Sequence, residues 1–244
     1  MKTKTAPDAP SAKEVLAQFE KLADPQTKKT LLRHCIPEPV LGVKIGEMKK
    51  IQKKLRNHHA LALELYESGI YDVMYFAGLI ADSRQVTKAE LQRWLDRAPC
   101  GAIAVFTVGA LAAESSAGLE LALKWIESPR ERVASAGWAT LAGIAGHVPD
   151  DKLPIAGFRK LIARVEKEIH QAPEDVRSQM NRFIIAVGGG IAPLSDTALE
   201  AARRIGKVEV DMGDTACKVP EAPAYIEKIK AMGRLGHKRE HVRC

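Results

Sequence analysis

The sequence has 244 residues, of which 46% are hydrophobic and only 5% aromatic. This length allows one sizeable core or about five or six helical pairs of roughly 40 residues each. The composition disfavours β-sandwiches, which depend on aromatic and β-branched residues. The longest apolar run, Gly101–Ala113, is too short for a membrane span, which needs about 20 residues. We therefore predict an all-α protein that does not enter a membrane.

Charge and cysteine usage suggest a setting and a partner. The formal net charge is +7, which is compatible with a polyanionic partner or simply with a basic protein. The amino terminus lacks the apolar core of a secretory signal. The four cysteines lie far apart in the sequence, at Cys35, Cys100, Cys217 and Cys244. Reduced thiols in the cytosol are the expected state.

The chain begins with two predicted helices. We expect residues 1–10, rich in Lys, Thr and Pro, to be disordered. Ser11 is typical of a helix N-cap and begins a helix to about Leu22. Asp24-Pro25 begins a second helix that ends near Cys35, followed by a loop.

The next predicted helix, Lys44–Asn57, has one apolar and one basic face. Ile45, Met48, Ile51 and Leu55 share the apolar face. The cations that follow the other arc are Lys44, Lys49, Lys50, Lys53, Lys54 and Arg56. Such a face can neutralise phosphates irrespective of base sequence, although it is also what an ordinary solvated helix presents.

Three further helices lead to the centre of the chain. The periodicity predicts helices over His58–Ser68 and Ile70–Ala81. Thr87 and Glu90 form a capping-box pattern, which begins a helix that ends at Arg97.

The unit that the chain repeats is clearest in residues 99–147. The apolar run Gly101–Ala113 is followed by Gly118–Glu127 and then by Arg130–His147, each with apolar residues at helical spacing. The predicted apolar positions are Leu119, Ala122, Leu123 and Ile126 in the second helix, and Val133, Gly137, Leu141 and Ile144 in the third. Ser128-Pro129 reads as an N-cap with proline at the first helical position. No single helix of this kind buries its apolar stripe alone, so we predict a HEAT-like or ARM-type helical-repeat superhelix, an α-solenoid.

The last third continues the pattern. We predict helices over Leu153–Ala172 and Glu174–Ile191, then one capped by Ser195, and a final helix over roughly Ala224–Met232. No long Gly/Ser linker is present, so we expect one repeat domain over residues 11–232 and a basic tail over residues 233–244.

Several segments resemble the HEAT-repeat DNA alkylation repair proteins, whose superfamily includes alkylpurine DNA glycosylases. They are Leu41-Gly42-Val43, Gly118–Ser128, Ala136–Gly143, Asn181–Val187 and the long stretch Lys207–Cys244. The resemblance implies a curved helical superhelix whose basic concave face holds duplex DNA. It also implies, for the characterised members, release of positively charged N3- or N7-alkylated purines.

The family's catalytic residues do not carry over. Its glycosylases have an aspartate four residues after a tryptophan on a central helix, so that both side chains share one face. Alignment of Ala104–Ala113 with that helix places Val105 at the tryptophan and Gly109 at the aspartate. The family's arginine falls near Ser135, and a further tryptophan falls near Ala186. We therefore expect a branch that binds DNA without the usual catalytic pair.

Other residues remain as site candidates. Glu114, near the end of the central helix, is the carboxylate most able to replace the missing aspartate; Asp72, Asp82 and Glu131 are alternatives, with helix capping as the plainer role for each. Cations that could extend a DNA-binding surface are Arg130, Arg132, Arg159, Arg177, Arg182, Lys238 and Arg239, although each could equally form surface ion pairs.

Three further patterns are weaker. Cys217, His237, His241 and Cys244 could hold zinc but lack a close Cys-x-x-Cys pair. Gly188-Gly189-Gly190 favours close helix packing over a phosphate loop, because no Gly-Lys-Ser/Thr follows. Trp94, Trp125 and Trp138 are more typical of core residues than of stacking platforms.

The sequence thus predicts a monomeric protein that binds double-stranded DNA and needs no cofactor. A glycosylase acting on alkylated purines is the enzymatic version of this hypothesis, and a HEAT-repeat protein–protein scaffold is the alternative.

Overall fold

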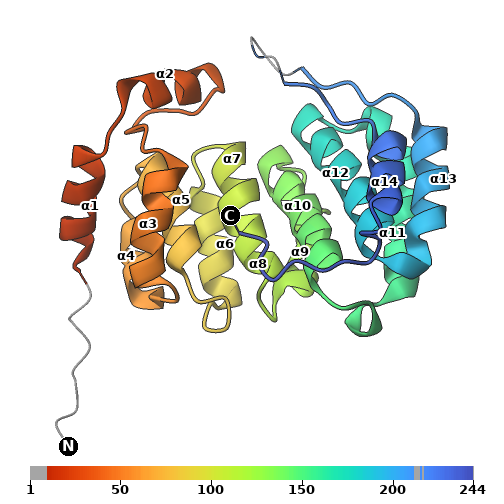
Figure 1. Cartoon of the computed structure of the whole chain (residues 1–244), viewed down its shortest axis with the longest axis horizontal. Helices are drawn as coiled ribbons and strands as arrows, with labels where there is room; N and C mark the ends of the chain where they lie inside the picture. The colour runs from red at the N-terminus through yellow and green to blue at the C-terminus, as the bar shows by residue number, and fades with distance from the viewer. Residues whose placement is uncertain (1–9, 212–214, 216, 244) are drawn as a thin grey trace, which may run out of the picture. The chain divides into compact units, whose positions relative to one another are not determined.

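The computed structural model of the chain describes residues 10–211, 215 and 217–243. The disorder expected for residues 1–10 therefore concerns positions that, except for Pro10, lie outside the described part. The chain divides into two compact units, one ending at Asp82 and the other beginning at Ser83. Within the described residues the regular elements are all helices (Figure 1), apart from one isolated antiparallel bridge between Ala23 and Val43.

Residues 10–82 of the amino-terminal unit form five helices, which follow the predicted order closely. Their bounds are α1(Ala12–Lys21), α2(Pro25–Arg33), α3(Ile45–Leu55), α4(His59–Tyr66) and α5(Tyr71–Ile80). Ser11 and Glu14 form a complete capping box at the start of α1. Phe19 of α1 and Phe76 of α5 are fully buried, with their ring centroids 5.0 Å apart. The core of this unit therefore lies between α1, α4 and α5.

A buried carboxylate shapes the loop before α3. Asp72 on α5 accepts hydrogen bonds from the backbone N–H groups of Leu41, Gly42 and Val43, at 2.6, 3.1 and 2.7 Å. Gly42 has φ +83°, and a Cβ placed there would lie 2.5 Å from the backbone nitrogen of Lys28. Only glycine fits this position. The Leu41-Gly42-Val43 motif is thus a tight turn tied to α5, and it sets where α3 begins.

The carboxy-terminal unit contains the repeated helices. They are α6(Lys88–Arg97), α7(Gly101–Ile103), the π-helical segment η1(Ala104–Gly109), α8(Ala110–Ala113), α9(Gly118–Trp125), α10(Glu131–His147), α11(Ile155–Glu168), α12(Glu174–Gly190), α13(Ser195–Ile205) and α14(Ala222–Ala231). Short 3-10 turns cover Asp150–Lys152, Ile169–Gln171 and Ala192–Leu194. The helix α10 packs against α9, α12 and η1, and α12 packs against α13 and α14. The core of the unit surrounds α10 and α12.

The tryptophans and the glycine triplet have the packing roles that the sequence favoured. Trp94, Trp125 and Trp138 are at most 1% exposed. A Cβ on Gly188 would lie 2.5 Å from Ile226 of α14, and one on Gly190 would lie 2.6 Å from the Ala145 carbonyl oxygen of α10. The triplet therefore lets two helices approach the end of α12 closely.

Some local expectations are wrong. Ser128 is not an N-cap: α10 begins at Glu131, and the Ser128 hydroxyl accepts a hydrogen bond from the Arg130 N–H in a turn. Ser195 lies inside α13, after a 3-10 turn, and donates to the Gly188 carbonyl oxygen instead. Ile45 is 47% exposed and Leu123 is 43% exposed, although both were assigned to apolar faces. In α9 the buried face contains Leu121, Ala122 and Trp125 instead.

No single helix in the described ranges is long and apolar enough to cross a membrane. By length and composition alone, one helix pair passes the same test: Glu174–Gly190 with Ala192–Ile205, which are bent by 117°.

Candidate nucleic-acid interface

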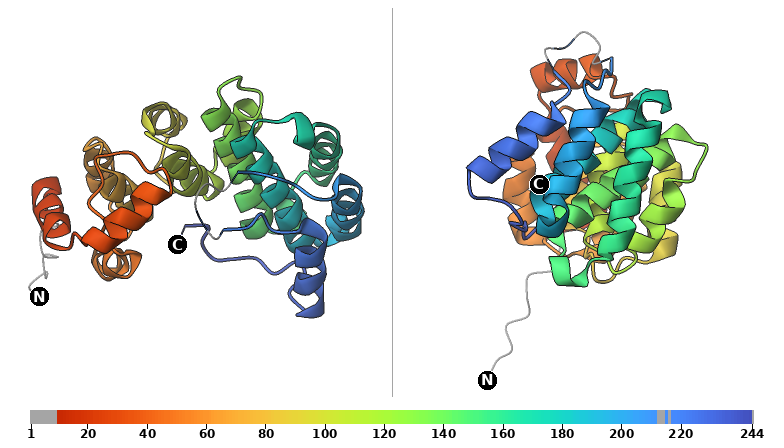
Figure 2. Two further views of the ribbon diagram at one scale, coloured as in Figure 1. Left: turned by 90° about the horizontal axis from the view of Figure 1, so that it is seen from above. Right: turned by 90° about the vertical axis from the view of Figure 1, so that its right-hand side faces the viewer.

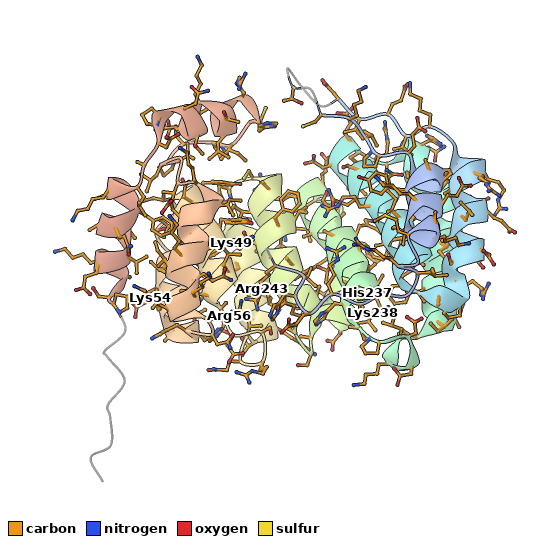
Figure 3. All side chains as sticks on the ribbon, in the orientation of Figure 1. Lys49, Lys54, Arg56, His237, Lys238 and Arg243 are labelled. Carbon is orange, nitrogen blue, oxygen red and sulfur yellow. The ribbon has the colours of Figure 1, made fainter. Side chains whose placement is uncertain are left out.

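The exposed face of α3 carries several lysines, some of which make no ion pair with the described residues. Met48, Ile51 and Leu55 are buried, which turns the lysines outward. Lys44 pairs with Asp24 at 3.1 Å and Lys50 pairs with Glu47 at 2.7 Å. Three lysines of this helix make no ion pair inside the described part of the chain: Lys49, Lys53 and Lys54. Figure 3 labels Lys49 and Lys54 along this helix. We call Lys49, Lys53 and Lys54 the α3 lysines.

In the carboxy-terminal unit the segment 233–243, here called the tail, runs along one face of the helices (Figures 1 and 2). It contacts the carboxyl ends of three helices in reverse chain order. The N–H of Gly236 donates to Gly189 of α12, and the N–H of Arg239 donates to Gly146 of α10, both at 2.9 Å. The N–H of Val242 then donates to Glu114, just after α8. The tail is therefore a packed part of the unit.

Glu114 and Arg243 anchor the end of the tail. The Glu114 side chain is 4% exposed and that of Arg243 is 9% exposed. One carboxylate oxygen accepts the N–H groups of Val242 and Arg243, at 2.7 and 3.0 Å. The other accepts the Arg243 guanidinium, at 3.0 Å from Nε and 2.6 Å from a terminal nitrogen. Burial raises the pKa of Glu114, but these hydrogen bonds and the charge of Arg243 outweigh it and leave the pKa below its usual value.

Lys238 is also held within the protein. Its Nζ donates to the carbonyl oxygens of Ala145 and Gly190 at 2.8 and 2.6 Å, and it lies 2.8 Å from a carboxylate oxygen of Asp150. These carbonyl groups belong to the carboxyl ends of α10 and α12, where helix dipoles favour a cation. Lys238, proposed from the sequence as a DNA contact, is thus a helix-capping residue. Figure 3 labels Lys238 and Arg243 along the tail.

A different arrangement surrounds Phe106. In η1 the other five residues are buried, whereas Phe106 is 50% exposed. The Arg182 guanidinium of α12 lies 5.2 Å from the centroid of its ring. Arg182 donates to the Gln179 side-chain oxygen at 3.0 Å. Burial, and then the charge of Arg239, lower the pKa of Arg182.

Three of the positions that align with the family's functional residues are buried. Val105 is 6% exposed and Gly109 is buried. A Cβ on Gly109 would lie 3.2 Å from the Ala136 carbonyl oxygen and 3.3 Å from the Thr140 hydroxyl. A side chain at this position would therefore be tightly packed against α10. Ser135 is 1% exposed, and its hydroxyl has no hydrogen-bond partner within the described residues.

The remaining candidate arginines are occupied by contacts within the protein. Arg130 pairs with Asp96 at 2.8 Å. Arg132 donates to the Ala98 carbonyl oxygen at 2.6 Å, and Arg159 of α11 donates to the Thr197 hydroxyl of α13 at 2.9 Å. Arg177 donates to the Glu209 and Ala172 carbonyl oxygens, at 2.8 and 2.9 Å. Arg182 differs from these arginines, because it lies close enough to Arg239 of the tail for that charge to lower the pKa of Arg182.

The other candidate carboxylates, and the Cys and His residues considered for zinc, do not form a catalytic or metal site within the described residues. Asp72 holds the turn before α3, and Glu131 accepts the N–H of Asp175 at 3.0 Å. Asp82 is 3% exposed. Among the described residues no group of three or more His, Cys, Asp or Glu could hold a metal ion. Cys217, His237 and His241 are therefore not part of such a group, and Cys244 lies outside the described residues.

Sequence reasoning missed Phe106 and Arg243. Phe106 lies in an apolar run, where an aromatic residue is normally core. It lies in a π-helical segment, which the sequence pattern did not indicate. Arg243 is 129 positions from Glu114, so no local pattern connects them.

Comparisons with known proteins identify a family and two relatives of similar length. Residues 15–226 match the family described as DNA alkylation repair enzyme. Two uncharacterised Listeria proteins each align over 218 residues, covering 87% of this chain and 94% of the relative. The one from Listeria innocua is 32% identical and the one from Listeria monocytogenes is 31% identical.

A solved structure is similar over nearly the whole chain. It is described as a new family of proteins related to the HEAT-like repeat DNA glycosylases with affinity for branched DNA structures. Its TM-score is 0.88 at 36% sequence identity, and the match covers 96% of this chain and 100% of that one. The predicted family resemblance and HEAT-like all-α fold are confirmed.

Proposed function

The chain belongs to the DNA alkylation repair enzyme family, and we propose that it binds DNA through the phosphate backbone, with branched DNA as its preferred form. The observation that carries this proposal is the group of α3 lysines, which are exposed without an ion pair inside the described part of the chain. Exposed lysines without an ion pair neutralise phosphates and release counterions when DNA binds. The affinity of the structurally similar family for branched DNA supports the preference.

We propose that this binding occurs without excision of alkylated purines by the family's usual residues. Val105 and Gly109 supply neither a stacking ring nor a carboxylate at the aligned positions. Glu114, the replacement considered from the sequence, is committed to Arg243 and is 4% exposed. A carboxylate in a buried ion pair is not available to stabilise a cationic sugar on a bound nucleotide.

Charge reversal of the α3 lysines tests the binding proposal. The variant Lys49→Glu/Lys53→Glu/Lys54→Glu should bind both a labelled three-way junction and a linear duplex much more weakly than the unmodified chain, by fluorescence anisotropy. A matched variant, Lys13→Glu/Lys21→Glu/Lys29→Glu, changes the net charge equally at exposed positions of α1 and α2. An equal loss in both variants would mean that only net charge matters, and unchanged binding in the first would contradict the proposal.

A second assay separates binding from excision and from a scaffold role. We expect no release of methylated purines from alkylated DNA at protein concentrations that saturate binding. Release would contradict the binding-only role. DNA affinity that does not fall with salt would also count against phosphate recognition and favour the protein–protein scaffold.

A further inference from the structure

Phe106 is exposed in a segment where every neighbour is buried. It lies at the centre of η1, and half of its side chain is accessible to water. Burying a phenylalanine is strongly favourable, so an outward ring in the core segment of a unit gains nothing for folding. π-Helical turns occur frequently at functional sites. This turn presents an aromatic face beside a guanidinium at 5.2 Å.

Arg182, which lies beside this ring, and Arg239 of the tail are not neutralised by an ion pair within the described residues. Arg182 donates only to a neutral amide oxygen of Gln179, and Arg239 makes no side-chain ion pair there. Each is close enough to the other for repulsion to lower the pKa of Arg182. Two guanidinium groups without a carboxylate destabilise a fold, but they form a ready site for an anion.

The tail holds Arg239 in place, whereas two other cations of the tail pair with carboxylates outside it. The backbone N–H of Arg239 donates to Gly146, and its carbonyl oxygen lies 2.9 Å from Nδ1 of His147. Its guanidinium lies 3.5 Å from the point where a Cβ on Gly146 would be. Lys238 and Arg243 of the same tail are paired with Asp150 and Glu114. Arg239 is therefore held in place with its charge available.

We infer that Phe106, Arg182 and Arg239 form a site for an unpaired nucleobase, stacked on the Phe106 ring, and for its phosphate, held by the two guanidinium groups. This inference rests on the proposed function. Stacking of a base on an aromatic ring tolerates any sequence because every base has a π face. Bidentate guanidinium groups match the geometry of a phosphate.

The ligand is an unpaired base at a branch point because the bases of a continuous duplex have no free face. Within a linear duplex both faces of each base are covered by its neighbours. At a branch point, stacking is interrupted and a base face becomes available. The site therefore supplies affinity for branched DNA beyond the phosphate contacts of a duplex.

The test measures Phe106→Leu, Arg182→Gln and Arg239→Gln in the full chain against a labelled three-way junction and a linear duplex. We expect each to weaken junction binding on the order of tenfold, the scale of one lost stacking or phosphate contact, with a much smaller effect on the duplex. Phe106→Trp should retain junction binding. Tyr225→Leu, which removes an equally exposed aromatic on α14 at 49% exposure, should leave both affinities unchanged.

A direct readout places 2-aminopurine at the branch of the junction. Its fluorescence should be quenched on binding the unmodified chain and Phe106→Trp, and less so on binding Phe106→Leu. Unchanged junction affinity and quenching in Phe106→Leu would overturn this inference while leaving DNA binding intact. An equal loss on junction and duplex would overturn the assignment to an unpaired base. If the unmodified chain bound neither DNA, the proposed function would fail, and the inference with it.

Discussion

Glu114 and Arg243 are separated by 129 positions, yet they form a buried ion pair with two guanidinium contacts and two backbone N–H groups on one carboxylate. The pair fixes the end of the tail, which lies along the carboxyl ends of α12, α10 and α8. It explains why a strongly basic segment lies against the protein. The helix ends supply carbonyl groups, and Glu114 and Asp150 supply charge.

Removing the carboxylate should destabilise the unit and release the tail. Glu114→Ala removes the carboxylate contacts of the Arg243 guanidinium and of two backbone N–H groups in a buried setting. Breaking a buried pair in this way costs about 3–5 kcal/mol. Urea unfolding should show the lower stability, and hydrogen exchange should accelerate at Gly236, Arg239 and Val242.

A double variant is the control for this prediction. Glu114→Ala/Arg243→Ala removes both charges and should recover part of the lost stability. If Glu114→Ala alone leaves stability and tail protection unchanged, the ion pair does not anchor the tail.

Acid should loosen the same anchor. The pKa of Glu114 in the folded chain lies below 4.5, its ordinary value. A lowered pKa contributes stability above the unfolded-state value and loses it as the pH falls through the folded-state value. Tail protection should therefore be constant at neutral pH and decline below pH 4.5. Glu114→Gln should lack this step in hydrogen exchange, and an identical step in the variant would assign it to other groups.

The α3 lysines should set part of the salt dependence of DNA binding. Each phosphate contact contributes about 0.9 to the slope of log affinity against log salt concentration for duplex DNA. Charge-neutral Lys49→Gln/Lys53→Gln/Lys54→Gln should therefore reduce the slope by up to about 2.7. Anisotropy titrations over a salt series measure it. A slope equal to that of the unmodified chain would place this helix away from DNA.

The glycine triplet gives a packing prediction. In Gly188→Ala the new methyl group would lie 2.5 Å from Cδ1 and 2.7 Å from Cγ1 of Ile226. Overpacking of this kind costs about 1–3 kcal/mol, and Ile226→Val in the same chain should recover part of it.

Gly157→Ala on α11 is the matched control in the same unit. Its nearest atom would be 3.7 Å away, so it should be neutral or stabilise by up to about 1 kcal/mol, the helix preference of alanine over glycine. Thermal unfolding of the variants should separate the two glycines. Equal effects at both positions would contradict the close approach of α14.

Features decided by neighbouring residues could be predicted from the sequence. The capping boxes at Ser11 and Thr87 depend on residues three positions apart, and both were expected helix starts. The buried stripe of α10 follows from its own periodicity. The N-cap predicted at Ser128 is wrong, because its hydroxyl accepts a hydrogen bond within the turn that precedes the helix. Serine is equally suited to helix caps and to turns, so the sequence does not distinguish them.

Features decided by the fold could not be predicted. Lys238 of the tail is a candidate DNA contact from the sequence because Asp150 and the helix ends that bind it lie far away in the chain. The exposure of the α3 lysines could be predicted because a helix face is a local property. Of the scattered arginines, only the fold shows that Arg182 reaches an exposed ring.

The π-helical segment changes how this helix should be compared with its relatives. A turn with i→i+5 hydrogen bonds accommodates more residues than the 3.6 of an α-helical turn. One extra residue rotates the helical phase by about 100°, so an ungapped alignment with a relative whose helix is α-helical throughout pairs side chains that point in different directions. Val105 stands opposite the family's tryptophan in such an alignment, but Phe106 is the outward-facing ring. Equivalent positions in this family are therefore to be matched by side-chain direction.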